Sequence, residues 1–262
     1  MEQSLLAIAV GNTRTRFGLF EGKDLSGASS LPSDQPGAIA KAVADMLVNH
    51  AGVPILISSV NTPASEALRT ALESAGDVYM VGSDIPIPLT HALDDASTLG
   101  QDRALCALAA YARAQQACVV VDVGTAVTVD FIDGEGIFQG GVIAPGLNMM
   151  LKSLHEHTAA LPLLEFAPPD PARGVFGLDT RHAMILGVQA AVRGLVREAI
   201  ERYAQAYEAY PQIVATGGDA ALLFENDDLI EHIVPDLQLV GILEAANAEL
   251  DAEPGADPDS RA

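Results

Sequence analysis

One strand–turn–strand pattern occurs twice in this chain, at residues 5–13 and 119–125. Aligning Gly11 with Gly124 places Ala9 where the second copy has Asp122. Glycine lets a backbone approach a ligand closely, amide and hydroxyl groups donate hydrogen bonds to phosphate oxygens, and a carboxylate can face a cation. The repeat therefore predicts two related halves, each with a hairpin suited to binding the phosphates of a nucleotide.

The acidic composition argues against a nucleic-acid partner. The 262 residues include 35 acidic and 14 basic ones, for a net charge of −21. Because phosphate-backbone binding needs clustered lysine and arginine, we expect no nucleic-acid partner. The acidic excess is compatible with an ordinary soluble protein and also with a salty cytoplasm, where self-repulsion is screened.

Hydropathy and cysteine usage predict a cytoplasmic protein without a membrane partner. No apolar run reaches the roughly 18–20 residues that a bilayer crossing needs, and no basic segment precedes an apolar stretch at the N-terminus as in a signal peptide. Cys106 falls on a helical stripe and Cys118 opens a strand. Both are predicted to be small core residues, not a disulfide or a catalytic thiol.

Alternating strand and helix patterns predict an α/β fold with helices on the faces of the sheets. The predicted strands cover residues 4–10, 15–21, 54–60, 78–81, 118–132 (a hairpin), 137–143 and 212–215. The predicted helices cover residues 37–49, 63–75, 102–115, a segment ending near 158, and 180–210. Four prolines predict an irregular excursion over residues 161–179.

The duplication also predicts the domain organisation. We expect an N-terminal domain at residues 1–117, a C-terminal domain at 118–250, and a disordered acidic tail at 251–262. The long helix carries two apolar stripes, one through Met184 and Val188 and the other through Val192 and Val196. With Gly187 allowing close approach, it is expected to pack against its own domain and against a second subunit.

Glycine-containing turns follow several of the predicted strands, at Gly11, Gly124, Gly140-Gly141 and Gly217-Gly218. In open α/β sheets ligands bind beyond the carboxyl ends of the strands. Another element, residues 100–103, stands at a loop-to-helix boundary. Asp102 there could be a helix-terminal acid stabilised by the dipole, or a carboxylate that accepts the proton of a substrate hydroxyl beside an arginine that holds an anion.

Together these motifs resemble the type III pantothenate kinase family over residues 4–245. They are Gly11-Asn12-Thr13, Thr98-Leu99-Gly100-Gln101-Asp102-Arg103, Asp122-Val123-Gly124-Thr125-Ala126, Gly140-Gly141-Val142-Ile143-Ala144-Pro145-Gly146 and Thr216-Gly217-Gly218-Asp219-Ala220. The resemblance implies two ribonuclease-H-like domains of the actin-like and sugar-kinase ATPase superfamily, with a nucleotide cleft between them. It implies ATP-dependent phosphorylation of pantothenate to 4'-phosphopantothenate, the first step of coenzyme A biosynthesis, by a homodimer.

The resemblance also implies roles for individual residues. Asp102 would be the general base. The residues expected to contact pantothenate are Gly100, Gln101, Asp102, Arg103, Thr180 and Leu93. Those expected to contact ATP, which would carry Mg²⁺, are Ala9, Val10, Gly11, Asn12, Thr13, Arg14, Thr15, Arg16, Thr125, Gly217 and Gly218. Asp122 would bind a monovalent cation, K⁺ or NH₄⁺.

The chain departs from the family pattern at two positions. Family members usually have aspartate where this chain has Ala9, and often tyrosine where it has Leu93. The first change removes a carboxylate expected to help hold Mg²⁺, a group typically worth on the order of 10²-fold or more in rate. Three hypotheses follow: an active kinase, a weakened or inactive member that binds or regulates, and a different sugar or acid kinase of the same superfamily.

Overall fold

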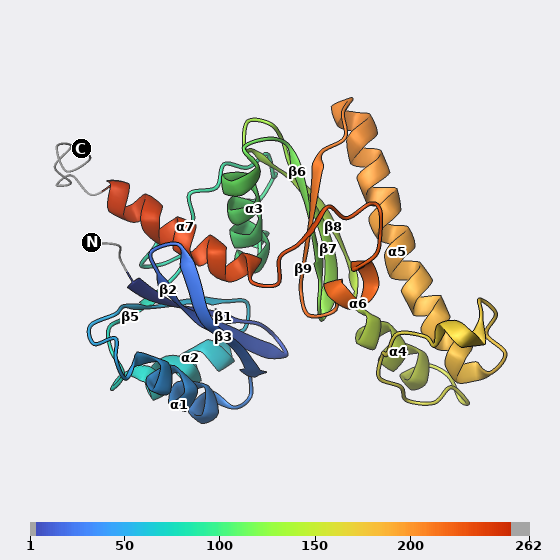
Figure 1. Cartoon of the computed structure of the whole chain (residues 1–262), viewed down its shortest axis with the longest axis horizontal. Coiled ribbons are helices and arrows are strands. Elements are labelled where there is room, and N and C mark those ends of the chain that lie inside the picture. The colour runs from blue at the N-terminus through green and yellow to red at the C-terminus, as the bar shows by residue number, and fades with distance from the viewer. Residues whose placement is uncertain (1–3, 253–262) are drawn as a thin grey trace. The chain divides into compact units, whose positions relative to one another are not determined.

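The computed structural model describes residues 4–252, and Figure 1 shows how their helices and strands follow one another. The strands are β1 Ser4–Val10, β2 Arg14–Glu21, β3 Asp24–Pro32, β4 Ile55–Ser59, β5 Val78–Met80, β6 Cys118–Val123, β7 Ala126–Ile132, β8 Phe138–Pro145, β9 Gln212–Thr216 and β10 His232–Ile233. The helices are α1 Pro36–Leu47, α2 Thr62–Leu72, α3 Gln101–Ala114, α4 Leu147–Glu156, α5 Thr180–Tyr207, α6 Ala220–Phe224 and α7 Leu237–Ala252. The predicted α/β class and both predicted hairpins are confirmed.

The strands form two five-stranded sheets with one topology. Their orders are β3-β2-β1-β4-β5 and β8-β7-β6-β9-β10. In each sheet the first three strands along the chain are antiparallel, and the last two join in parallel. The sequence repeat thus extends to a repeat of whole sheets, which confirms the predicted pair of related domains.

Contacts along the chain divide it into two compact units. Within the described residues, unit 1 comprises residues 4–90, 95–112 and 236–252, and unit 2 comprises residues 91–94 and 113–235. The C-terminal helix α7 therefore belongs with the N-terminal sheet. Residues 251 and 252 lie within α7, and the rest of the predicted tail, 253–262, lies outside the described residues. The predicted boundaries at 117 and 250 stay a prediction.

In unit 1, helices cover both faces of the sheet (Figure 1). One face, which includes Ile8, Phe17 and Ile57, packs with apolar residues of α1 and α2 such as Ile39 and Leu68. The opposite face packs against α7 and part of α3. Gly241 of α7 lies against Leu105 of α3 so closely that a Cβ at residue 241 would overlap the Leu105 carbonyl, and this close approach requires glycine.

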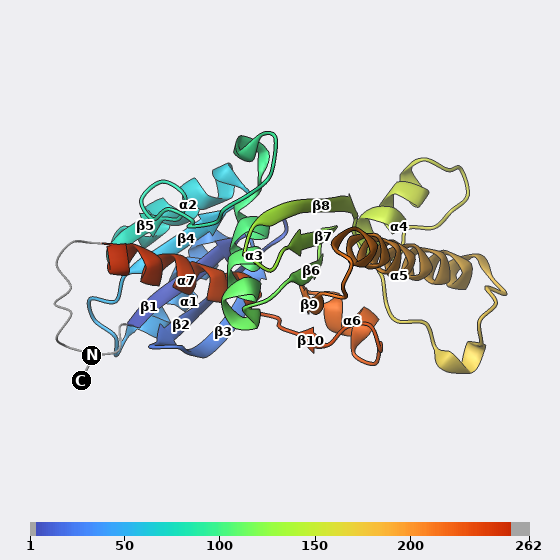
Figure 2. The same cartoon turned by 90° about the horizontal axis from the view of Figure 1, so that it is seen from above.

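In unit 2, α5 packs along one face of the second sheet, and α4 lies beside it (Figure 2). Met184, Val188, Val192 and Val196 all belong to one buried face of α5, so the two predicted stripes merge into a single broad one. Ala191 is exposed. The prediction of two separate apolar faces was wrong. Each step of four residues rotates the side-chain direction by only about 40° around the helix axis, so the residues of both stripes lie on neighbouring parts of one face.

Both cysteines are buried, as predicted for small core residues. Burial raises the pKa of the Cys118 thiol to about 12. Since the thiolate is the reactive species, neither cysteine is expected to react with an aromatic disulfide reagent in the folded protein at about pH 8. Absorbance should show both thiols reacting only after unfolding, and fast labelling of the native protein would contradict this placement.

Candidate functional site

The first phosphate-loop candidate joins β1 to β2 and is held by its own backbone and by one serine. The Gly11 amide donates to the Arg14 carbonyl at 3.0 Å. Ser33 Oγ donates to the Gly11 carbonyl at 2.9 Å and lies 3.0 Å from Thr15 Oγ1. Asn12 and Thr13 are exposed at the tip of the turn. Sequence reasoning missed Ser33, because its distance along the chain from this loop left no pattern to find it by.

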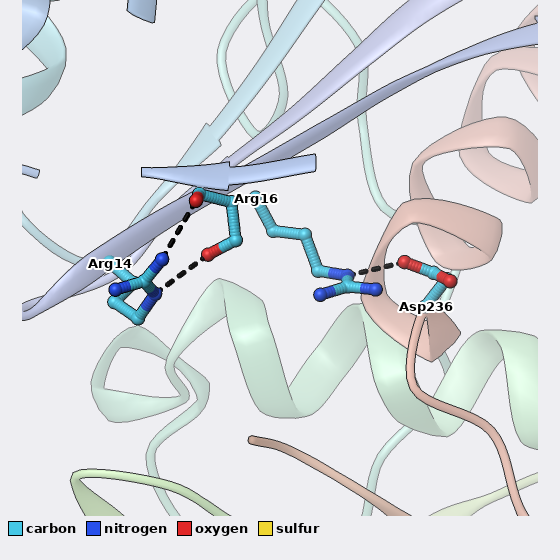
Figure 3. A network of polar contacts seen from close by, with 4 residues as sticks. Arg14, Arg16 and Asp236 are labelled. Carbon is cyan, nitrogen blue, oxygen red and sulfur yellow. Dashed lines mark hydrogen bonds and ion pairs between the residues drawn. The ribbon is translucent and has the colours of Figure 1, made fainter. Parts of the chain in front are cut away.

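Two arginines that were predicted to contact ATP have partners within unit 1 (Figure 3). Arg14 donates to Ser30 Oγ at 2.9 Å and to the Ser30 carbonyl at 2.7 Å. Arg16 Nε donates to Asp236 Oδ1 in an ion pair. Ala9 and Val10 are buried in β1, so any contact they make with a ligand involves backbone more than side chain.

The predicted base lies in the first turn of α3, also in unit 1. The Asp102 carboxylate folds back over Gly100, where a Cβ would overlap its Oδ1. The same oxygen accepts a hydrogen bond from the Arg103 amide at 2.8 Å. Gln101 Oε1 accepts from the Ser59 amide at 3.1 Å, and its amide nitrogen lies against Gly82. Gln101 therefore anchors the start of α3 to the end of β4, and Gly100 leaves room for the carboxylate.

In unit 2, three turns meet at the carboxyl end of β6. A Cβ at residue 146 would lie 2.6 Å from the Thr125 carbonyl oxygen. A Cβ at residue 217 would overlap Asp122 Oδ1 and the Val123 carbonyl, and Gly217 has φ +93°. The structure thus brings together Gly124, Thr125, Asp122 and Gly217. Such convergence at strand ends is the usual location of a ligand site in α/β proteins.

Two acids of unit 2 have shifted pKa values. Asp219, the residue before α6, is partly buried, and burial raises its pKa. Asp179 caps α5 by accepting from the His182 amide at 2.9 Å. Its hydrogen bond from Arg173, together with that cap, lowers its pKa to about 2. Asp179 therefore stays ionised at all ordinary pH values and holds the start of α5 in place.

Thr180 and Leu93 lie in other parts of unit 2. Thr180 is exposed at the first position of α5, and the next two residues, Arg181 and His182, line a groove of about 480 Å³. Leu93 packs near Gly140 of β8, where its Cδ2 would lie 3.4 Å from an added Cβ. Leu93 is partly buried.

Within residues 4–252, no group of three or more His, Cys, Asp or Glu side chains forms a metal-binding cluster. Mg²⁺ that is bound with a nucleotide commonly has one or two protein carboxylates and completes its coordination shell with phosphate oxygens and water. Among the helices of this same stretch, none combines the length and apolar character that crossing a membrane requires.

Comparison with known proteins identifies the family. The sequence model of type III pantothenate kinase matches residues 5–202. The type III pantothenate kinase of Dehalococcoides mccartyi is 32% identical over 257 residues, which cover 92% of this chain and 96% of the relative. This chain belongs to the type III pantothenate kinase family. The predicted resemblance is thereby confirmed.

Solved structures support the fold of this family member. A Campylobacter jejuni protein described as a conserved putative Baf family transcriptional activator has a TM-score of 0.63 at 22% identity, covering 94% of this chain and 100% of that one. An archaeal actin homologue has a TM-score of 0.52 at 14% identity, covering 95% and 100%. At these identities the likeness concerns architecture alone, and it confirms the actin-like fold class.

Proposed function

We propose that this type III pantothenate kinase family member transfers a phosphoryl group from ATP to the primary hydroxyl of pantothenate, giving 4'-phosphopantothenate for coenzyme A biosynthesis. The observation that carries the proposal is the family match over most of the chain, joined to the intact Gly100–Arg103 element at the start of α3. The relatives do not favour the binding-only alternative.

Each predicted group has a chemical task in this reaction. Asp102 accepts the hydroxyl proton, and Arg103 holds the pantothenate carboxylate. The Gly11 and Gly124 loops present amides to the ATP phosphates, and Gly217-Gly218 leaves room for the nucleoside. Phosphoryl transfer depends mainly on positioning and on charge neutralisation. Mg²⁺, when bound with ATP, supplies part of that neutralisation.

Further parts of the proposal concern ions, assembly and compartment. We propose K⁺ or NH₄⁺ at Asp122, because its carboxylate lies beside the Gly217 turn and the Val123 carbonyl. We propose a homodimer, supported by large exposed apolar side chains just before α5, Val175, Phe176 and Leu178, which are 75–82% exposed. We also propose a cytoplasmic location, since two buried cysteine thiols agree with a reducing compartment.

The test is an ADP-release assay with coupled detection, in Mg²⁺ and K⁺. ADP release that requires pantothenate, and that glucose does not support, is expected. The Ala9→Asp variant is measured beside the wild-type protein. Turnover in neither protein would favour the binding role, and turnover only in the variant would show that Ala9 inactivates the chain. Turnover with a sugar in place of pantothenate would favour another kinase of the superfamily.

A further inference from the structure

The two repeats match in strand register as well as in sequence. Ala9 of β1 lies opposite Arg16 of β2 and Ser58 of β4. Asp122 of β6 has the corresponding place in the second sheet, between β7 and β9. The second repeat therefore carries a carboxylate at a position where the first carries a methyl group, and no other residue of β1 takes its place.

A carboxylate is linked to Ala9 through one side chain, that of its register partner Arg16. Residues directly opposed on antiparallel strands project from the same face of a sheet, so Arg16 shares a face with Ala9. That face packs against α7, since Ala9 belongs to one apolar cluster with Leu239 and Ile242. Arg16 reaches the start of this helix and donates to Asp236 Oδ1 (Figure 3). Asp236 is 220 residues from Arg16 in sequence.

A second contact fixes the start of α7 at the same point. Gln238 Nε2 donates to Ser58 Oγ at 3.4 Å, and Ser58 is the other register partner of Ala9. Asp236 also benefits from the positive end of the helix dipole of α7. Arg16 thus binds the Asp236 carboxylate on one side of Ala9, and the Gln238 contact holds the start of α7 on the other side.

The ion pair between Arg16 and Asp236 is expected to add little to the stability of the fold. Their side chains are 38% and 22% exposed, and ion pairs that water reaches contribute little to the free energy of unfolding. Arg16 engages one carboxylate oxygen, Oδ1. In residues 4–252, the other oxygen, Oδ2, has no hydrogen-bond or ion-pair partner. One oxygen is therefore positioned and the other is open to a ligand.

We propose that Asp236 supplies the carboxylate of the first phosphate loop, in place of the one that the repeat lacks at Ala9, and that Asp236 binds the divalent cation carried by ATP. This inference rests on the proposed function. Mg²⁺ commonly takes one or two protein carboxylates and completes its shell with phosphate oxygens and water, so a single well-placed aspartate is sufficient. Arg16 is then a positioning residue for Asp236.

The test measures metal binding, apart from turnover. Mn²⁺ is titrated into the protein saturated with ADP, and free Mn²⁺ is followed by electron paramagnetic resonance. Asp236→Asn is expected to weaken Mn²⁺ binding by roughly 10-fold or more, while the affinity for ADP without metal is retained. Adding Ala9→Asp to Asp236→Asn is expected to recover part of the loss, because the carboxylate then comes from β1.

Asp227→Asn is the matched control. Asp227 forms an ion pair with Arg193 in unit 2, whereas the first loop belongs to unit 1, and its loss should leave Mn²⁺ affinity unchanged. A second variant, Asp236→Ser, is measured beside Asp236→Asn, because serine is also neutral and also caps helices well. Thermal unfolding of each variant shows whether it is folded. Unchanged Mn²⁺ affinity in folded Asp236 variants would overturn this inference alone. A wild-type protein that binds no ADP would overturn the proposed function and this inference with it.

Discussion

Asp102→Asn is expected to lower kcat by on the order of 10²–10⁴-fold, with little change in KM for ATP. Asparagine has nearly the same shape and can still accept the hydrogen bond that Asp102 Oδ1 receives from the Arg103 amide at 2.8 Å. The start of α3 should therefore keep its geometry. What is lost is the ability to take the proton of the attacking hydroxyl.

Steady-state kinetics with ATP and pantothenate varied in turn measure this effect. Asp95→Asn is the matched control, because Asp95 caps a neighbouring short helix by accepting from the Ser97 amide at 2.9 Å. Asparagine can make the same contact, so its kcat should match the wild-type value. Full activity in Asp102→Asn would remove Asp102 as the base and leave the α3 element with a structural role only.

Gly217→Ala is expected to lower kcat/KM for ATP by on the order of 10²-fold and to destabilise the fold by about 1–3 kcal/mol. The residue has φ +93°, a conformation that side chains disfavour. A Cβ there would also overlap Asp122 Oδ1 and the Val123 carbonyl. Both effects displace the carboxyl end of β6, where the second phosphate loop begins.

Chemical denaturation and ATP-dependent kinetics measure the two parts of this prediction. Gly218→Ala is the control for stability, since nothing lies within 4 Å of a Cβ at the next residue. Gly37→Ala, on α1 with the same open surroundings, is the control for activity. Wild-type stability and wild-type ATP kinetics in Gly217→Ala would contradict the prediction, because they would show that neither the fold nor ATP use depends on the close packing of the three turns in unit 2.

Local patterns in the sequence predicted the hairpins and most of the helices. Each apolar strand and each glycine turn is recognisable from a few neighbouring residues, and the duplication is recognisable because the same short pattern occurs twice. The edge strand β3 was missed, because its serine- and glycine-rich sequence is partly exposed and does not alternate. Helix α7 was missed because Leu237, Leu239, Ile242 and Leu243 are apolar on several sides and leave no stripe.

Local sequence patterns predicted only part of the candidate site. The motifs predicted the Gly11 and Gly124 loops and the Asp102 element, since each is a short contiguous segment. Asp236 contacts Arg16, the register partner of Ala9, because α7 packs against the first sheet although it follows the whole second sheet in the sequence. No spacing in the sequence encodes that contact, although Pro235-Asp236 before an apolar run is a usable signal for a helix start.

The most direct test of the central claim is to identify the product. The wild-type protein is incubated with ATP, Mg²⁺, K⁺ and pantothenate, and the mixture is analysed by ³¹P nuclear magnetic resonance and mass spectrometry. We expect one phosphate monoester on the primary hydroxyl of pantothenate for each ADP formed, and on the order of 10²-fold less or lower still in the same time with Asp102→Asn. ADP formation without phosphorylated pantothenate, or no consumption of ATP by the folded wild-type protein, would contradict this claim.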